Sequence, residues 1–327
     1  MAEMLLAGDV GGTNARLSLL SRDGRKVLRR DALPSRDYPR LEAAVRVVLG
    51  DDRVKAAAIG VAGPVLQGRC NATNLPWSID ERALSKRLGI PKVTLQNDLV
   101  VAAYGALEAP PRTVELLWGE RRPRGTGGNV AILAAGTGLG EAALVWDGER
   151  HVSLATEGGH VDFAPRSELE ARLLLFLRKR LGKRVSYERV LSGPGIGHLY
   201  DFFHSAEGAR ETAPNLTKLA KATDRNAAIT ELALSKKSRP GARAIDLFMS
   251  LLGAEAGNLA LKTLPAGGLF IAGNIAGHLF PKLGPKRFLE AFFDKGRMEP
   301  LLRRVPVALL TDSDVGLRGS MRLVREL

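Results

Sequence analysis

Apolar and polar positions along the chain alternate in a way that is typical of a mixed α/β protein. Over the first hundred residues, apolar residues at helical spacing predict helices at Tyr38–Leu49 and Val100–Leu107, and a short apolar run predicts a strand at Val93–Leu95. Further on, the charged and alanine-rich residues 205–245 indicate surface helices joined by loops. Ala242–Leu264 is apolar with many small residues, which predicts a buried helix.

The same order of parts occurs twice. An apolar strand leads into a glycine-rich turn and a second apolar strand, first around Gly8–Leu20 and again around Ala131–Val145. Each pair is followed by a strand of buried type that ends in Ala-Gly, at Ala56–Gly63 and at Gly268–Gly273. The repeated order predicts an internal duplication, with an insertion in the second half that lies mostly between residues 147 and 260.

The first turn, Gly8–Asn14, has residue types that suit a polyphosphate and its metal. Gly11 and Gly12 let the backbone take positive φ and bring N–H groups close to an anion. Asp9 can hold a hydrated Mg²⁺, and Thr13 and the asparagine after it add hydrogen-bond donors. The alternative is an ordinary glycine-rich hairpin, which the second, similar turn at 136–140 makes less attractive.

Length and composition fit a soluble protein with about two domains. The chain has 327 residues and 45% hydrophobic content, and no stretch approaches the roughly 20 apolar residues of a membrane helix. The N-terminus does not resemble a signal peptide, so we expect a cytoplasmic protein with no membrane partner. The single cysteine, Cys70, excludes an intrachain disulfide and a thiolate-rich zinc cluster, and is expected to be a small buried side chain.

The net charge of +13 raises the question of a nucleic-acid partner. Basic residues are spread widely, with local concentrations at 121–124 and 236–239, and aromatic residues make up only 5% of the chain. This pattern offers no stacking platform for bases. We therefore predict a solvated basic surface that favours anionic substrates, and no specific nucleic-acid partner.

Two glycine- or proline-rich segments are expected to be irregular. Pro110–Gly128 is predicted to be a linker or surface hairpin near a domain boundary, and Gly193–Gly197 is predicted to be a turn. The second resembles a dinucleotide fingerprint only superficially, because a proline lies inside it and no strand precedes it. The sequence has no Walker phosphate loop, no His-Glu-x-x-His zinc motif and no Gly-x-Ser-x-Gly elbow.

Three polar clusters are candidates for the chemistry. Asn97 and Asp98 follow a strand and precede a helix, where ligands bind in open α/β sheets, although Asp98 could equally be a helix cap. Glu157 and His160 flank a Gly-Gly turn after another strand. Because the two glycines disfavour a helix, we do not expect these residues to form a metal site on an α-helix. Glu188 is a third candidate, with a capping-region acid or a partner of the neighbouring arginine as the alternative.

Together these motifs resemble those of bacterial glucokinases, in the hexokinase and actin-like ATPase superfamily. The resemblance covers nearly the whole chain and rests on Gly8–Arg16, Asn97-Asp98, Gly136–Gly140, Glu157–Pro165, Ser186–Gly195 and Phe270–Gly273. It implies an α/β fold of two duplicated, ribonuclease-H-like lobes. The smaller α/β lobe would comprise 1–109 and 311–327, and the larger α+β lobe, with a helical insertion, 110–310.

The resemblance also implies roles for single residues. Asn97, Asp98, Glu157, His160 and Glu188 would hold the sugar hydroxyls, with Asp98 as the catalytic base. Asp9 would hold Mg²⁺, through water. The residues expected to bind ATP are Gly8, Asp9, Val10, Gly11, Gly12, Thr13, Gly136, Thr137 and Gly138 at the phosphates and Gly273 near the adenosine.

The implied reaction transfers the γ-phosphoryl group of Mg-ATP to the C6 hydroxyl of glucose, in a cytoplasmic homodimer of the glycolytic pathway. No structural zinc is expected, because Val161–Pro165 stands where related proteins often have a cysteine-rich motif. Ala135 and Asn274 replace more usual glycines, and Asn274 could alter the adenosine side. The alternatives are a kinase for another hexose, a polyphosphate-using enzyme, and a sugar-binding regulator with little turnover.

Overall fold

The computed structural model describes residues 4–72, 75–120, 122–123 and 127–327. The chain folds into two compact units, each made of separate stretches of sequence. The first unit contains the residues up to Val114, Ala142–Ala155 and Asp312–Leu327, and the second contains Glu115–Glu141 and Thr156–Thr311. The expected lobes, 1–109 with 311–327 and 110–310, stay a prediction.

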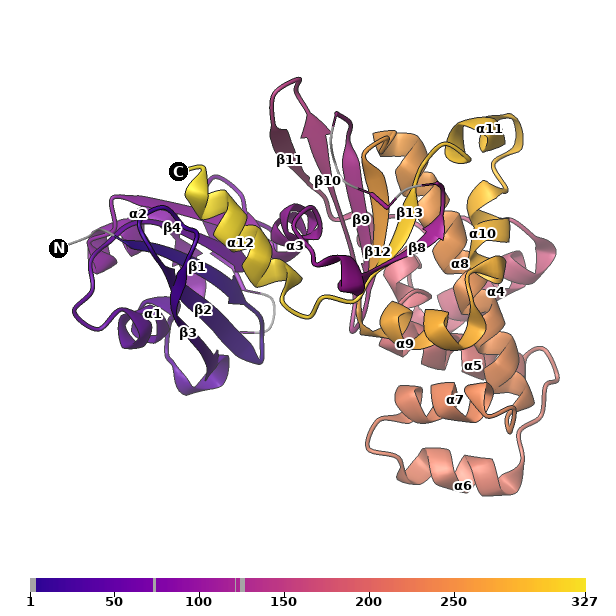
Figure 1. Ribbon diagram of the computed structural model, residues 1–327. Coiled ribbons are helices and arrows are strands. Elements are labelled where there is room, and N and C mark those ends of the chain that lie inside the picture. Colours follow the sequence, from indigo (N-terminus) through magenta and orange to yellow (C-terminus); the bar gives the residue numbers. More distant parts are fainter. Residues whose placement is uncertain (1–3, 73–74, 121, 124–126) are drawn as a thin grey trace. The chain divides into compact units, whose positions relative to one another are not determined.

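A five-stranded sheet forms the centre of the first unit (Figure 1). Strands β1, β2 and β3 make an antiparallel meander, and β1, β4 and β7 run parallel. The strand order is β3 (Val27–Pro34), β2 (Asn14–Leu20), β1 (Met4–Val10), β4 (Val54–Val61) and β7 (Lys92–Asn97). Each strand expected in this part of the sequence is therefore present.

A six-stranded sheet repeats this order and confirms the predicted duplication. Its strands are β11 (His151–Ala155), β10 (Leu139–Trp146), β9 (Val130–Ala135), β12 (Gly268–Ala272), β13 (Val307–Leu310) and β8 (Val114–Trp118). The first five match β3, β2, β1, β4 and β7 in order, and β9, β12 and β13 are parallel, as their counterparts are.

The sixth strand corrects one expectation. Pro110–Gly128 is not simply a linker or a surface hairpin, because β8 lies within it and pairs with β13 at the edge of the sheet. Val114 and Leu117 are buried there, so the short apolar strand Val114–Trp118 within this otherwise polar segment is recruited to the sheet. Residues 121 and 124–126 of this segment lie outside the described part of the chain.

Side chains of the first sheet alternate between two layers of helices, as a period of two requires. Leu6 and Val10 lie in a core with α1 (Leu41–Leu49) and α2 (Glu81–Leu88). Leu5 and Ala7 pack instead against α12 (Val315–Arg325), the helix near the end of the chain. The Ser320 hydroxyl of α12 donates to Gly8 O at 2.6 Å, which ties this helix to the strand that leads into the glycine-rich turn.

Most helices of the second unit fall between strands β11 and β12 in the sequence. They are α4 (Glu168–Leu181), α5 (Gly193–Ser205), α6 (Ala213–Lys221), α7 (Arg225–Leu234) and α8 (Arg239–Thr263), followed after β12 by α9 (Asn274–Leu283), α10 (Lys286–Phe293) and α11 (Glu299–Leu302). The long insertion predicted for the second half is thus helical. The charged segment 205–245 forms α6 and α7, as expected for helices joined by loops.

The longest helix, α8, is the buried helix predicted from its small apolar residues. Leu252 and Ala256 share a core with Leu133 of β9 and Ile271 of β12. By length and composition α8 could cross a membrane, but 83% of its most apolar window is buried inside the structure, as in the core helix of a globular protein.

The Gly193–Gly197 segment is the first part of a helix, not the turn that was predicted. Helix α5 begins at Gly193, and Pro194 occupies its first turn, where a missing N–H costs nothing. The Ser192 hydroxyl caps this end by accepting from Gly195 N at 3.1 Å. The expectation was wrong because glycine and proline were interpreted as helix breakers when they stand at a helix start.

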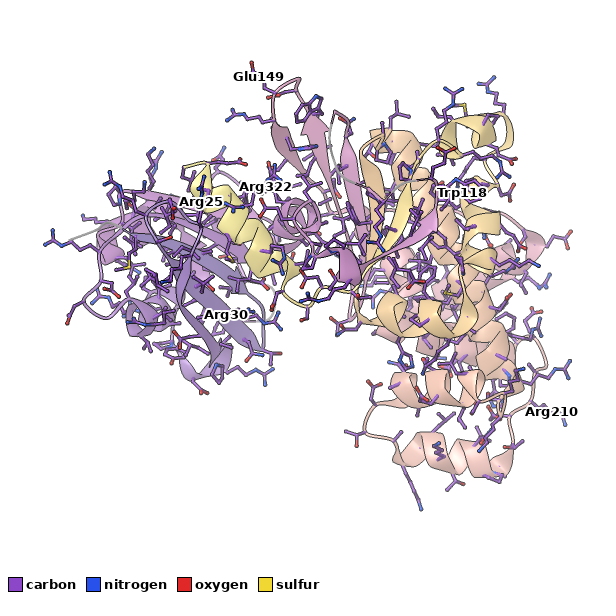
Figure 2. All side chains as sticks on the ribbon, in the orientation of Figure 1. Arg25, Arg30, Trp118, Glu149, Arg210 and Arg322 are labelled. Atoms are coloured by element: carbon purple, nitrogen blue, oxygen red, sulfur yellow. The ribbon has the colours of Figure 1, made fainter. Side chains whose placement is uncertain are left out.

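Basic side chains are distributed over both units. Arg25, Arg30 and Arg322 belong to the first unit and Arg210 to the second (Figure 2). Several have acidic partners: Arg30 pairs with Asp314, and Arg322 Nη1 lies 3.9 Å from Glu108 Oε1. The positive charge is therefore spread out and partly compensated, as the sequence indicated.

Candidate active site

In the first unit, the turn between β1 and β2 is held by Ser35. Gly11 N donates to Asn14 O at 3.0 Å and closes the turn. Ser35 Oγ donates to Gly11 O at 2.8 Å, and Ser35 N donates to Thr13 O at 2.9 Å. Gly11 and Gly12 do not take positive φ, so that expectation was wrong: the turn closes with ordinary backbone angles. A Cβ on Gly11 would have its nearest neighbour at 3.8 Å, so the turn leaves open space for a ligand.

Asp9 lies one residue before the end of β1 and has an incompletely compensated charge. Arg16, its partner in the register of β1 and β2, has Nη1 3.8 Å from Asp9 Oδ2 and donates instead to Ser313 O at 2.8 Å. Burial raises the pKa of Asp9, and the Arg16 charge opposes this only in part. A Cβ on Gly316 would meet the Asp9 carboxyl at 2.8 Å, so this group rests against the first turn of α12.

Asn97 and Asp98 mark the junction between β7 and α3 (Asp98–Ala106). Asn97 is the N-cap: its Oδ1 accepts from Leu99 N at 2.8 Å, and its Nδ2 donates to Gly63 O at 3.1 Å. Asp98 is the first helical residue, with Oδ1 3.0 Å from Leu99 N. The principal cap is therefore Asn97, and the Asp98 carboxylate lies at the positive end of α3.

Cys70 lies in β5 (Arg69–Asn71), which pairs with β6 (Ser78–Asp80), and is buried as predicted. Burial raises the pKa of its thiol, and the charge of Asp98 acts in the same direction. The uncharged Cys70 thiol is thus a neighbour of the Asp98 carboxylate.

In the second unit, the three sugar-site candidates come together around His160. Glu157 precedes the single 3₁₀ turn Gly158–His160, and Glu188 lies in a second such turn, Tyr187–Arg189. His160 Nε2 is 4.0 Å from Glu157 Oε2, and His160 Nδ1 is 4.0 Å from Glu188 Oε1. About half of the Glu157 and His160 side chains is exposed, at 54% each, so their polar atoms are available to a ligand.

Glu188 connects this cluster to the second glycine-rich turn. Its Oε2 accepts from Leu139 N at 3.2 Å, and a Cβ on Gly138 would lie 2.6 Å from the same oxygen. The turn itself is closed by Gly136 N donating to Gly138 O at 2.9 Å. The residues predicted to bind phosphate and those predicted to bind sugar are therefore neighbours within this unit.

Gly273 joins β12 to α9 in a conformation that favours glycine. Its φ is +93°, and a Cβ would lie 2.2 Å from Ala135 O at the end of β9. The next residue, Asn274, lines a cavity of about 330 Å³. Other residues around this cavity are Gly193, Ile196, Asn226 and His278. The sequence motifs did not indicate Asn226 or His278, because helices α7 and α9 bring them to the cavity from distant parts of the chain.

The structure thus groups the candidates in two sets. The first unit holds Asp9, Asn97 and Asp98, and the second holds Glu157, His160, Glu188, Gly138 and Gly273. Among the described residues, no group of three or more His, Cys, Asp or Glu side chains is placed to hold a metal ion by itself. A metal here would need further ligands from a substrate or from water.

Comparison with known proteins decides the family. The glucokinase family model matches residues 6–327. The chain belongs to the glucokinase family. A glucokinase from Nostoc punctiforme is 37% identical over 97% of both chains. The crystal structure of a glucokinase from an Antarctic psychrotroph has a TM-score of 0.84 and 31% identity, with all of both chains covered. These findings confirm the family, the fold class and the sugar-kinase activity predicted from the sequence.

A more distant structure shares the fold alone. It is a ROK family glucokinase from Streptomyces griseus, solved in complex with glucose and AMPPNP, with a TM-score of 0.65 and 20% identity over 99% of this chain and 100% of the other.

Proposed function

We propose that this glucokinase-family chain transfers the γ-phosphoryl group of Mg-ATP to the C6 hydroxyl of glucose, which gives glucose 6-phosphate and ADP. The observation that carries this proposal is the cluster of Glu157, His160 and Glu188, whose last member accepts a hydrogen bond from Leu139 N, directly after the Gly136–Gly138 turn. A sugar held by the cluster would lie beside phosphates held by the turn. Phosphoryl transfer depends mainly on such alignment.

In this proposal Asn97, Asp98, Glu157, His160 and Glu188 bind the sugar hydroxyls. Carboxylate and imidazole groups form charge-assisted hydrogen bonds with hydroxyls, which are stronger than neutral ones. A sugar that lacks or inverts one hydroxyl leaves a polar group of the site without its partner. The site is expected to discriminate among hexoses by this penalty.

Asp98 is the proposed base. Its position at the N-terminus of α3 stabilises the ionised carboxylate, the form that accepts a proton. As the C6 oxygen forms its bond to phosphorus, the hydroxyl proton passes to Asp98 and the bond between the γ-phosphorus and the bridging oxygen of ADP breaks. A weakly basic carboxylate suffices, because the hydroxyl becomes acidic only as its oxygen bonds to phosphorus.

The two glycine-rich turns are the proposed phosphate sites, at Gly8–Thr13 and at Gly136–Gly138. The adenosine is placed in the cavity beside Gly273, where Asn274, Asn226 and His278 offer polar groups. Asn274 replaces a glycine that is more usual in the family, so it is a point at which this chain can differ from its relatives in nucleotide binding.

Asp9 fits the expected Mg²⁺ site. Its carboxylate is largely buried, the arginine opposite lies 3.8 Å away, and burial raises the pKa of Asp9 despite that arginine. A carboxylate oxygen together with water and phosphate oxygens is a ligand set that Mg²⁺ prefers. When bound, Mg²⁺ supplies charge neutralisation to the phosphates.

The remaining expectations rest on the resemblance to the family. We propose that the two lobes, 1–109 with 311–327 and 110–310, close over the sugar and exclude water. We also propose a cytoplasmic homodimer, which sedimentation of the purified protein would test.

The test of the proposed function is ADP release with Mg-ATP and a panel of hexoses, and glucose phosphorylation with polyphosphate as donor. The parent protein and Asp98→Asn are compared. Turnover that requires glucose and ATP and is lost in the variant supports the proposal. Turnover with another sugar or with polyphosphate would replace the proposed substrate, and glucose binding without turnover would identify a sugar-binding regulator.

A further inference from the structure

Two buried glutamates lie beneath the candidate sugar cluster. Glu141 of β10 is 2% exposed and Glu255 of α8 is 0% exposed. The sequence did not single out either residue, because each lies in an apolar element with no recognisable motif. Burying two neighbouring carboxyl groups with one cation at their edge, Lys262 beside Glu255, is costly, so the arrangement calls for an explanation.

Glu141 supports the glycine loop between Glu157 and His160. A Cβ on Gly158 would lie 2.1 Å from Glu141 Oε2, so the loop backbone rests directly on this carboxyl group. The main chain reinforces the contact: Thr156 Oγ1 donates to Glu141 O at 2.9 Å and accepts from Gly158 N at 3.2 Å. Any change in the position or charge of the Glu141 side chain is therefore transmitted to the loop.

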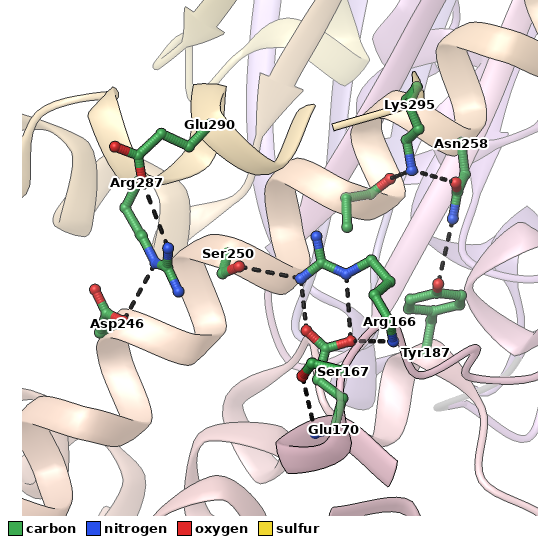
Figure 3. A network of polar contacts seen from close by, with 11 residues as sticks. Arg166, Ser167, Glu170, Tyr187, Asp246, Ser250, Asn258, Arg287, Glu290 and Lys295 are labelled. Atoms are coloured by element: carbon green, nitrogen blue, oxygen red, sulfur yellow. Dashed lines mark hydrogen bonds and ion pairs between the residues drawn. The ribbon is translucent and has the colours of Figure 1, made fainter. Parts of the chain in front are cut away.

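Glu255 connects Glu141 to the turn that carries Glu188, the other side of the cluster. The Glu141 and Glu255 carboxyl groups are close enough for their charges to interact, and Glu141 Oε1 and Glu255 Oε1 are both buried with no hydrogen-bond partner among the described residues. Asn258 Nδ2 donates to Glu255 Oε2 at 2.8 Å. Asn258 Nδ2 also donates to Tyr187 Oη at 3.2 Å, and Asn258 Oδ1 accepts from Lys295 Nζ at 2.6 Å (Figure 3). Tyr187 directly precedes Glu188, so both sides of the cluster rest on one network.

The charges of this network favour one proton on the pair. Burial raises the pKa of Glu141 to about 8, and the Glu255 charge acts in the same direction. The nearest opposing charge is Lys262, whose Nζ lies 3.7 Å from Glu255 Oε1. At neutral pH Glu141 therefore keeps its proton, and the pair carries one negative charge rather than two.

Other titratable groups surround the pair. Burial lowers the pKa of Lys295, while burial followed by the Glu255 charge raises the pKa of Tyr187 to about 12. Glu157 and His160 lie on the loop itself. Because several of these groups titrate, a pH profile must be compared with that of a variant that changes Glu141 alone.

We propose that Glu141, buried beside Glu255, is a positioning residue that holds the Gly158 loop and thereby fixes Glu157 and His160 for sugar binding. This inference rests on the proposed function of the cluster. Loss of the Glu141 proton places two negative charges side by side under the loop, and their repulsion displaces it. The KM for glucose then rises at alkaline pH, and the KM for ATP does not follow it.

The test measures KM for glucose and for ATP at pH 7 and pH 9 in the full-length protein. In the parent, the glucose value is expected to rise by up to about tenfold between the two, the limit for one ionisation near pH 8. Glu141→Gln keeps the shape and a hydrogen-bond donor but cannot ionise. The ratio of its glucose KM at pH 9 to that at pH 7 is therefore expected to fall to near one. Glu141→Leu removes the donor and raises the glucose KM at pH 7 as well, and the contrast with glutamine separates positioning from packing.

Glu170→Gln is the matched control, because Glu170 is also buried in the second unit but pairs with Arg166 (Figure 3). The ratio of the glucose KM at pH 9 to that at pH 7 in Glu170→Gln is expected to equal that of the parent. If Glu141→Gln does not fold, Glu255→Gln replaces it: with no charge beside Glu141, loss of the Glu141 proton causes no repulsion, so the alkaline rise in glucose KM is expected to disappear.

The possible failures are distinct. A parent protein that neither binds nor phosphorylates glucose would refute the proposed function. A parent with normal turnover whose alkaline rise persists unchanged in Glu141→Gln would refute the role of Glu141 and leave the proposed function standing. Calorimetric titration of glucose at both pH values gives the same comparison for binding alone.

Discussion

The two units hold their candidate site residues by different means. In the first unit, Asn97 and Asp98 are fixed by backbone groups at the start of α3, and Asp9 rests against the first turn of α12. In the second unit, Glu157, His160 and Glu188 face one another, and their loops rest on the buried side chains of Glu141 and Glu255.

This difference predicts how each unit responds to substitution of a site residue. A backbone cap is set by the local chain and costs only about 1 kcal/mol to lose, so the chemistry of Asp98 can be removed without disturbing its surroundings. A side-chain network depends on every member, and truncating one leaves the others with unsatisfied buried groups. Substitutions in the first unit should therefore affect catalysis separately from binding, while those in the second should affect binding together with stability.

The largest effect is expected from Asp98→Asn. Loss of the base should lower kcat by about 10³-fold, while the dissociation constant for glucose, measured by calorimetry, changes only a few-fold because asparagine keeps the hydrogen-bonding shape. Asp80→Asn is the control in the same unit, since Asp80 caps α2 by accepting from Ala83 N at 2.9 Å and asparagine caps equally well. A kcat that survives in Asp98→Asn would rule out its role as base.

Glu157→Gln should act on binding. A hydrogen bond to a charged group contributes about 1.5–3 kcal/mol and one to a neutral group about 0.5–1.5 kcal/mol, so exchanging carboxylate for amide is expected to raise the KM for glucose roughly tenfold, with a smaller change in kcat and no change in the KM for ATP. Steady-state kinetics with each substrate varied in turn measures the three values. The exposed Glu168 of α4 provides the control Glu168→Gln, and equal effects of the two substitutions would contradict a specific role for Glu157.

Gly138→Ala should affect binding and stability together. The added methyl group would lie 2.6 Å from Glu188 Oε2, so the turn or the carboxylate must move. We expect an increase of about tenfold in the KM for glucose and a loss of about 1–3 kcal/mol of unfolding free energy, as for overpacked sites. Gly136→Ala is the stability control, because a Cβ there has no neighbour within 4 Å. Equal melting temperatures for the two variants would contradict the close contact of Gly138 with Glu188.

The smallest effect on activity at pH 7 is expected from Glu141→Gln, whose main consequence is a change in the pH dependence of stability. The unfolded chain releases this proton near pH 4.5, whereas the folded protein keeps it to about 8, so the unfolded state binds fewer protons in this range. The unfolding free energy should therefore fall as pH rises, by at most about 1.4 kcal/mol per pH unit from this group. Urea unfolding between pH 5 and pH 8 should show a shallower fall in Glu141→Gln than in the parent, and parallel curves would contradict the raised pKa.

The strands and the two glycine-rich turns could be predicted from the sequence because they depend on neighbouring residues. The apolar run before Gly8, the small residues of Ala242–Leu264 and the Asn-Asp pair after Val93–Leu95 all have local signals. Local patterns failed where position along an element decides the outcome. Gly193 and Pro194 look like helix breakers in isolation, yet they begin α5, and Pro110–Gly128 looks like a linker, yet β13 recruits part of it as β8.

The sequence by itself determined the order of the duplicated parts, the residue types at the candidate site and the family to which they point. Only the tertiary structure decided that Glu188 reaches Leu139, that Asn226 and His278 line a cavity with Asn274, and that Glu141 and Glu255 meet under the Gly158 loop. The physical reason is that these relations join residues from separate elements. Burial, charge and close contact then arise only when packing brings those elements together.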